Sequence, residues 1–320
     1  MVVTRLVNVL DEEERTAFRA ACVLPFFDVG LAAVVGQVSS GAVERAIRFA
    51  LVEENRDSSY THRVHDVIRN LVKIDRRSQG YWGDGDWNAA ARRGLVEAKR
   101  RIAEARAAKN EQAEIEAIVL GIRLAHEWKL TGSGLEDAVR DGPSIRVLES
   151  YLPKVTAADA SMTESGALIS FVHAVSLPQR RGLEQLEILS RIGQPASARA
   201  SLFLAYRQRS QGRSGDALAT LAQIAARDPS MAEYAHFQYA VTLRMVRRFQ
   251  DAVAYADKHL PESPRKSRFT VICQRMHGMF DADTPRSRAS ARVLQDSTRV
   301  RLESEVSDLL ADARTDGVPF

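Results

Sequence analysis

The sequence predicts a mainly α fold, with one small β-hairpin near the N-terminus and helix pairs repeated along the second half. Apolar residues recur three and four positions apart through most of the 320 residues, which is typical of amphipathic helices. Residues 60–64 alternate instead, which is typical of a short strand. Ala252 and Pro264 repeat Ala217 and Pro229 after 35 residues, a period typical of stacked helix pairs.

The composition is ordinary for a soluble protein, with 45% hydrophobic and 27% charged residues and room for two or three domains. The net charge of +4 is not concentrated in one basic block, so it does not indicate a nucleic-acid binder. The most apolar window, residues 20–38, contains Pro25, Asp28 and Gly30 and makes a poor membrane span. We therefore expect no membrane partner.

The two cysteines predict a cytoplasmic protein. Cys22 and Cys273 lie far apart in apolar helical sequence without metal-ligand neighbours, so we expect two buried free thiols in a reducing compartment. The first residues turn acidic where a signal peptide would have its apolar core, and we expect no such peptide.

Residues 1–78 form the first expected domain. Asp11 and Glu14 have the spacing of a capping box that opens a helix. The expected elements are helices from Asp11, around 31–35 and at 41–49, strands at 50–53 and 59–63 joined by a turn at 55–58, and a final helix. Three helices followed by a hairpin is the order of a winged-helix domain.

The junction between the last strand and the final helix, within YTHRVHDVIRNLV at 60–72, holds the first candidate site. The stripe predicted to face the core consists of Val64, Val67, Ile68, Leu71 and Val72. His65 and Asp66 lie where the helix begins, and a helix N-terminus favours an acidic residue. In the simpler alternative, His65 is a structural histidine and Asp66 an ordinary first-turn acid.

Residues 10–72 resemble the winged-helix domain that follows the nucleotide-binding core of STAND-type signalling NTPases, the NB-ARC and NACHT relatives. The wing of that family ends in a Met-His-Asp motif, matched here by Val64-His65-Asp66 with the methionine replaced. The resemblance implies that His65 faces the β-phosphate of a bound ADP and that the pair senses nucleotide in a complete receptor.

The charge distribution does not favour DNA binding by this domain. The third helix carries only Glu44, Arg45 and Arg48 as charged residues, which is weak for contacts in a major groove. The basic residues of the final helix and its exit are expected to form a solvated face; they are Arg69, Lys73, Arg76 and Arg77.

Residues 79–144 are expected to form a linker and a helical hairpin. The glycine- and aspartate-rich stretch 78–88 indicates the linker, and Asp84 and Asp86 lack the further oxygen ligands of a calcium loop. Helical periodicity runs through 89–131, broken at 108–112. The run Lys99–Arg101 is expected on the solvent face of this hairpin.

Residues 145–320 are expected to form helical repeats. The stretch 201–229 resembles a tetratricopeptide unit, with Leu204 and Ala205 in its first helix, Gly212 at the turn, Ala217 and Leu221 in its second helix, and Pro229 ending it. Further helices are expected at 267–280, 286–296 and 298–313, which become increasingly charged and form the polar end of the array.

The resemblance implies a binding surface on the first helices of the repeats. The residues on the concave wall would be Arg199, Leu202, Tyr206, Arg209, Tyr234, Phe237, Val241 and Arg244. Arginine and aromatic side chains dominate binding hot spots, so we expect a protein or peptide ligand. In the simpler alternative, half of these side chains pack between neighbouring units.

The chain contains no motif for catalysis, including G-x-x-x-x-G-K-[ST], G-x-S-x-G and H-E-x-x-H. We expect no enzyme activity, no metal and no cofactor in this chain, with ADP or ATP bound only by an NTPase module in cis or in trans. The leading hypothesis is the sensor portion of a bacterial STAND-type receptor, which oligomerises on activation in regulation or anti-phage defence. The alternatives are a winged-helix transcription regulator and a free-standing adaptor.

Overall fold

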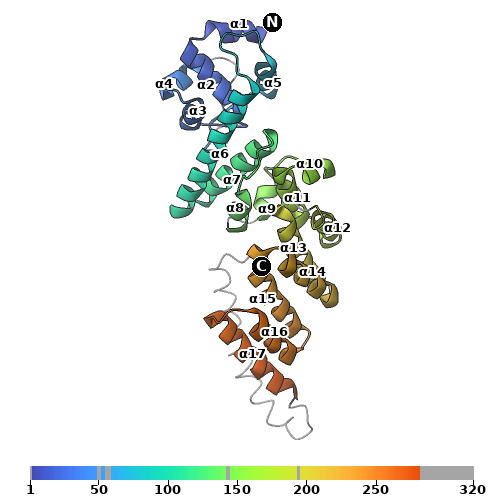
Figure 1. Ribbon diagram of the computed structural model, residues 1–320. Coiled ribbons are helices and arrows are strands. Elements are labelled where there is room, and N and C mark those ends of the chain that lie inside the picture. The colour runs from blue at the N-terminus through green and yellow to red at the C-terminus, as the bar shows by residue number, and fades with distance from the viewer. Residues whose placement is uncertain (1, 49–51, 55–58, 142–144, 193–194, 282–320) are drawn as a thin grey trace. The chain divides into compact units, whose positions relative to one another are not determined.

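The computed structural model describes residues 2–48, 52–54, 59–141, 145–192 and 195–281. Within them the chain forms seventeen helices and one two-stranded sheet, which confirms the mainly α fold (Figure 1). The chain divides into two compact units, Met1–Ser176 and Leu177–Phe320, each described by itself below. In the described part no helix combines the length and the apolar character that a membrane span requires.

The N-terminal part follows the predicted order of elements after one additional helix. The helices are α1 Val2–Val9, α2 Glu12–Val23, α3 Val29–Gly36, α4 Ser40–Ile47 and α5 Asp66–Ile74, and the strands are β1 Val52–Glu54 and β2 His62–Val64. The predicted capping box is present, because Glu14 N donates to Asp11 Oδ1 at 2.7 Å and Asp11 N to Glu14 Oε2 at 3.2 Å. The side chains of Asp28 and Ser39 cap α3 and α4 by accepting the N–H groups of Leu31 and Ala42.

The hairpin is antiparallel, with Val52 opposite Val64. Its second strand covers 62–64 and so begins later than the predicted 59–63. Phe27 and His62 exchange backbone hydrogen bonds of 2.8 and 2.9 Å, which ties β2 to the loop after α2. The predicted turn at 55–58 and the first residues of the predicted strand at 50–53 lie outside the described residues.

The predicted helical hairpin is formed by α6 Asp84–Ala107 and α7 Glu111–Glu127. Helix α6 begins inside the stretch expected to be a linker, because the Asp86 side chain accepts the Gly83 N–H at 2.9 Å and caps the first turn. The two helices pack closely: a Cβ on Gly94 would lie 2.8 Å from Leu124 Cδ2. Trp87, which is buried, stacks on Trp128 with ring centroids 5.9 Å apart.

The first unit extends beyond the domain boundary expected at residue 144. It includes α8 Leu135–Asp141, α9 Ile145–Glu149, α10 Ala157–Met162 and α11 Glu164–Ser176. Helices α8, α9 and α11 all contact α7, so the hairpin serves as the central support of this unit rather than as a spacer.

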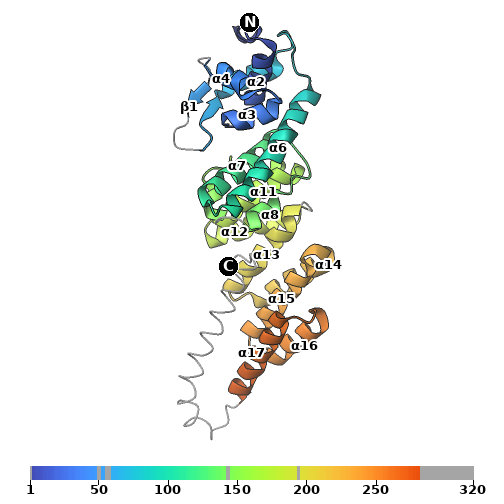
Figure 2. The same cartoon turned by 90° about the vertical axis from the view of Figure 1, so that its left-hand side faces the viewer.

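The second unit contains α12 Gln179–Leu189, α13 Pro195–Ser210, α14 Ser214–Arg227, α15 Pro229–Met245, α16 Phe249–His259 and α17 Pro264–Asp281. Each helix packs on the next in sequence, and α13 also contacts α15. Figure 2 shows α14 and α16 along one side of this stack. The predicted helices at 286–296 and 298–313 lie outside the described residues.

Proline marks the repeat in this unit at helix starts. Pro195, Pro229 and Pro264 are each the first residue of a helix, where the missing N–H costs nothing. Pro229 therefore opens α15, whereas the repeat pattern predicted that it ends the preceding helix. Gly212 and Arg247, which are 35 residues apart, both adopt the left-handed conformation at the turn, with φ of 76° and 64°.

Buried residues of the repeat match the predicted positions. Two apolar clusters fill the stack: Leu202, Ala205, Ala217, Leu221, Ile224 and Ala235 form the first, and Ala240, Leu243, Ala252, Ala256, Leu260, Phe269 and Cys273 form the second. Equivalent helices thus contribute small and branched side chains to successive layers, as a repeated architecture requires.

Replacing Leu124 by alanine tests the supporting role of α7. Leu124 is fully buried, so Leu124→Ala is expected to lower the free energy of unfolding by roughly 2–5 kcal/mol. Val96→Ala on the exposed face of α6 is the control and should change it by less than about 0.5 kcal/mol. Urea unfolding followed by circular dichroism gives both values, and equal effects would contradict the packing described above.

Candidate functional site

His65 is the N-cap residue of α5, between β2 and the helix, as the sequence predicts. Its Nδ1 accepts a hydrogen bond of 3.3 Å from Val67 N. In the neutral ring this acceptor role leaves the hydrogen on Nε2. Asp66 is the first residue of α5, and both side chains are exposed. The junction therefore presents a histidine and a carboxylate at a helix N-terminus.

The buried side of α5 differs from the predicted apolar stripe. Val64 and Val72 are buried, but Val67 and Leu71 are exposed. The reason is that an arginine, Arg69, occupies the inward position with only 6% of its surface exposed. The prediction of a solvated basic face is therefore wrong for Arg69.

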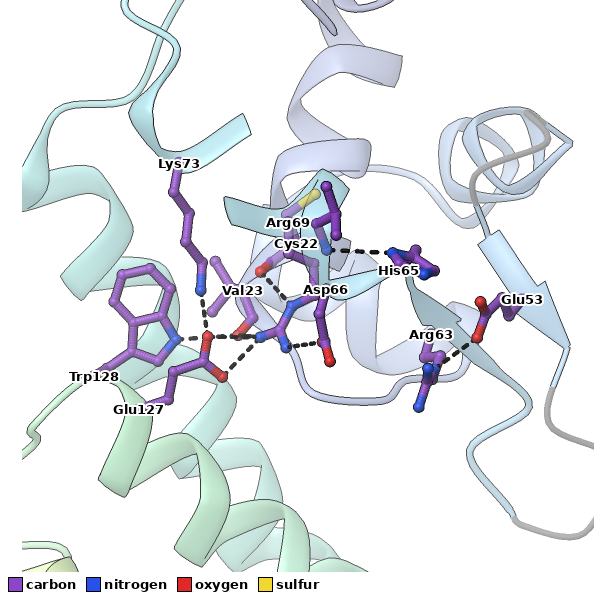
Figure 3. A network of polar contacts seen from close by, with 11 residues as sticks. Cys22, Val23, Glu53, Arg63, His65, Asp66, Arg69, Lys73, Glu127 and Trp128 are labelled. Carbon is purple, nitrogen blue, oxygen red and sulfur yellow. Dashed lines mark hydrogen bonds and ion pairs between the residues drawn. The ribbon is translucent and has the colours of Figure 1, made fainter. Parts of the chain in front are cut away.

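Arg69 donates to the C-terminal end of α2. Its Nε lies 3.1 Å from Cys22 O and its Nη2 3.3 Å from Val23 O (Figure 3). The last carbonyl groups of a helix have no partner within the helix and carry partial negative charge, so a guanidinium there satisfies both requirements. This cap joins α2 to α5.

The same guanidinium forms a two-pronged ion pair with Glu127 at the end of α7. Nη2 of Arg69 lies 2.9 and 2.8 Å from the two carboxylate oxygens, and Nη1 lies 3.4 Å from Asp66 Oδ1. Lys73 also pairs with Glu127. Figure 3 shows Glu127 and Asp66 reaching Arg69 from opposite sides.

Trp128 completes this contact between α2, α5 and α7. Its Nε1 donates to Val23 O at 3.1 Å, and Lys73 Nζ lies 4.5 Å from the centre of its ring. We call Arg69, Lys73, Glu127 and Trp128 the Arg69 network. Nothing in the sequence separates Arg69 from the exposed Arg76 and Arg77, because only the position of the α2 terminus makes it a buried donor.

A second arginine connects α6 to the N-terminal helices. Arg101 lies 3.1 Å from Asp28 Oδ1 and 3.0 Å from Glu97 Oε1, and its guanidinium is 5.5 Å from the centre of the Tyr60 ring. Tyr60 is buried, and this burial raises the pKa of its hydroxyl to about 12. The prediction of a solvent face for Lys99–Arg101 holds for Lys99 and Arg100 and is wrong for Arg101.

In the second unit, the structure brings together five of the eight predicted wall residues, which are Tyr206, Arg209, Tyr234, Phe237 and Arg244. Tyr206 and Tyr234 share a hydrogen bond of 2.6 Å between their hydroxyl groups. Arg209 lies 5.1 Å from the centre of the Tyr206 ring and donates to Gln238 at 3.3 Å. The neighbouring helices α13 and α15 are thus connected by polar and ring contacts.

Two further arginines lie over aromatic rings of α15 and α17. Arg244 is 5.6 Å from the centre of the Phe269 ring, and Arg265 is 3.9 Å from that of Phe237. We call Tyr206, Arg209, Tyr234, Phe237, Arg244 and Arg265 the arginine–aromatic face. Arg265 was not among the predicted wall residues, because it opens α17, outside the two repeat units that carry the predicted positions.

The remaining candidates of the predicted wall have other positions. Arg199 is half-buried on α13, about two helical turns before Tyr206. Leu202 is buried in the first apolar cluster, and Val241 packs against the second. Part of the predicted wall therefore packs within the stack, as the simpler alternative held.

Among the described residues, no group of three or more His, Cys, Asp or Glu side chains is placed to hold a metal ion. The chain matches no protein-family model, and no curated protein or solved structure shows significant similarity to it.

A double-mutant cycle tests the Arg69 network. Arg69→Gln and Glu127→Gln should show a coupling energy of roughly 1–3 kcal/mol in urea unfolding, because the pair is two-pronged and Arg69 is buried. The control cycle uses Arg213→Gln and Asp216→Asn, an exposed pair with a 2.7 Å contact, and its coupling should stay below about 0.5 kcal/mol. Equal coupling energies in the two cycles would contradict the conclusion that the Arg69–Glu127 pair stabilises the unit more than an exposed ion pair does.

Alkylation of Cys22 reports opening of the same network. Burial raises the pKa of the Cys22 thiol to about 12 and that of Cys273 to about 11, so both stay protonated and inert to iodoacetamide at pH 8. Glu127→Gln should accelerate modification of Cys22, whose carbonyl Arg69 caps, and leave Cys273 unchanged. Mass spectrometry of timed samples measures both rates; parallel acceleration would indicate global unfolding instead.

Proposed function

We propose that this chain is the sensor and relay portion of a STAND-type signalling receptor, in which helical repeats of the tetratricopeptide type bind a protein trigger and a winged-helix domain senses nucleotide. The observation that carries the proposal is the Arg69 network. The helix that begins at His65 and Asp66 is fastened through one guanidinium to α2 and to Glu127 at the end of α7. A displacement of α7 therefore acts directly on the His65 junction.

The surface around His65 supports contact with an NTPase module. His65 is exposed, and with Nδ1 accepting from Val67 N its Nε2 is left as the donor to an acceptor such as a phosphate oxygen. Val67, Leu71 and Ile74 lie on one stripe of α5 and are all exposed. An apolar stripe next to a polar N-cap suits a protein domain that packs on α5 and presents its nucleotide to His65.

The proposed mechanism uses these two features in turn. Trigger binding to the repeats strains the first unit and weakens the pair between Arg69 and Glu127. Helix α5 then turns relative to α2, His65 leaves the β-phosphate, and the module exchanges ADP for ATP and oligomerises. Such a receptor serves regulation or defence against phage.

The alternative of a DNA-binding regulator is less well supported. In α4, the helix that would enter a major groove, the Arg45 guanidinium lies 2.7 Å from Glu14 and 3.7 Å from Asp11. These carboxylates neutralise the positive charge of Arg45, which would be needed to bind a DNA phosphate. An adaptor function would retain the arginine–aromatic face and give the His65 junction no role.

Two measurements test the proposed function. The source DNA upstream of the Met1 codon, or a neighbouring gene, should encode a P-loop module in frame or as a partner. In the receptor assembled with that module, His65→Ala should raise the trigger-free oligomer fraction in light scattering, because a contact that holds ADP is lost. Asn70→Ala, an exposed change on the same helix, is the control. A receptor that remains monomeric with His65→Ala would contradict the assigned role.

A further inference from the structure

The second unit contains two kinds of basic residue. Exposed arginines at the starts of α14 and α16 are paired: Arg213 lies 2.7 Å from Asp216, and Arg248 lies 2.6 Å from Asp251. Lys266 is likewise paired with Glu262 at 2.7 Å. Here the sequence supplies a carboxylate within three or four positions of each cation, so these charges are neutralised locally.

The three arginines of the arginine–aromatic face have no such partner. Among the described residues, no carboxylate lies within ion-pair distance of Arg209, Arg244 or Arg265. Each guanidinium is instead held over a ring. All three are half-buried, and a guanidinium without a counter-ion attracts a negatively charged group that comes within hydrogen-bond distance.

These arginines lie on neighbouring groups: the rings of Phe237 and Phe269, which Arg265 and Arg244 cover, have centroids 5.7 Å apart, and Arg209 donates to Gln238 and Thr242 of α15. Burial, together with the neighbouring charge of Arg244, lowers the pKa of Arg209. Burial also lowers the pKa of Arg244. The charges of Arg209 and Arg265 both act on the Tyr234 hydroxyl. Three half-buried guanidinium groups thus share one surface across α13, α15 and α17.

The rings decide between two classes of anionic ligand. Proteins that bind single-stranded nucleic acid stack bases on open aromatic faces. On this surface Arg209, Arg265 and Arg244 already cover rings of Tyr206, Phe237 and Phe269. What remains available is the edges of Arg244 and Arg265 and the N–H groups of Arg209 other than those of Nη1, which donate to Gln238 and Thr242. The N–H groups of a guanidinium edge match the two oxygens of a carboxylate.

We propose that the arginine–aromatic face binds an acidic peptide segment of a protein partner, with its Asp and Glu carboxylates on Arg209, Arg244 and Arg265. Stacking restricts the guanidinium groups before binding, so less side-chain freedom is lost when a carboxylate arrives. The inference rests on the proposed function only for the identification of this segment as the trigger; the binding itself needs neither nucleotide nor NTPase module.

The experiment is a selection of random dodecapeptides displayed on phage against the full chain. Recovered peptides should be enriched in Asp and Glu. A synthesised, fluorescein-labelled example should lose at least about tenfold in affinity on Arg244→Gln or Arg265→Gln, measured by anisotropy, and similarly when its acids are replaced by amides. Arg213→Gln, which removes a paired arginine of the same unit, is the control and should change affinity by less than about twofold.

Three outcomes would overturn the proposal: recovered peptides without acidic enrichment, affinities insensitive to both arginine substitutions in variants that melt like the parent, or binding of a labelled oligothymidylate in place of every peptide. Because Arg265 lies in the first turn of α17, Arg265→Gln serves if Arg244→Gln does not fold. A negative result in this binding experiment does not affect the His65 test of the proposed function, and a negative His65 test does not affect the binding of acidic peptides.

Discussion

The first unit depends on the burial of one guanidinium. Arg69 has lost most of its contact with water, so it must be surrounded by acceptors, and these come from three different helices. Removing a cation from water is costly, so the fold is stable only while all of these acceptors stay within hydrogen-bond distance of Arg69. The positions of α2, α5 and α7 are coupled for that reason. Because His65 caps α5, a movement of these helices also moves His65.

The two units use arginine in opposite ways. In the first, Arg69 and Arg101 meet carboxylates from distant parts of the chain, and each connects elements that hydrophobic packing alone would allow to slide. In the second, Arg209, Arg244 and Arg265 meet rings and no carboxylate of the described chain. The first arrangement contributes to the unit's own cohesion, whereas the second leaves three positive charges for which the described residues supply no carboxylate.

The sequence predicted the elements that local periodicity determines. The hairpin α6–α7 and the pairs α13–α14 and α15–α16 were found from apolar spacing and from a repeat of 35 residues, because both patterns are properties of one segment. The His65 junction was located for the same reason, through the change from alternating to helical spacing.

The missed features depend on pairs of segments. The apolar spacing through Val67 and Leu71 is helical whichever side of α5 faces inward. Arg69 is on the buried side because its guanidinium donates to the carbonyl groups at the end of α2. Arg101 and Arg265 were misjudged or missed likewise, since their partners Asp28 and Phe237 are remote in sequence. Contacts between residues that are remote in sequence cannot be predicted from the spacing within one segment, so they became visible only in the structure.

The distribution of tryptophan gives the first unit a built-in optical probe. The chain has three tryptophans, and Trp82, Trp87 and Trp128 form one chain of ring contacts of 4.9 and 5.9 Å. The last of them is hydrogen-bonded to the α2 terminus and lies under Lys73. Fluorescence excited at the red edge of the absorption band therefore comes entirely from the tryptophan cluster at the start of α6 and the end of α7, whose last member, Trp128, lies at the join between α2, α5 and α7. Any change in its intensity or wavelength reports on that cluster without a label, while the second unit remains dark.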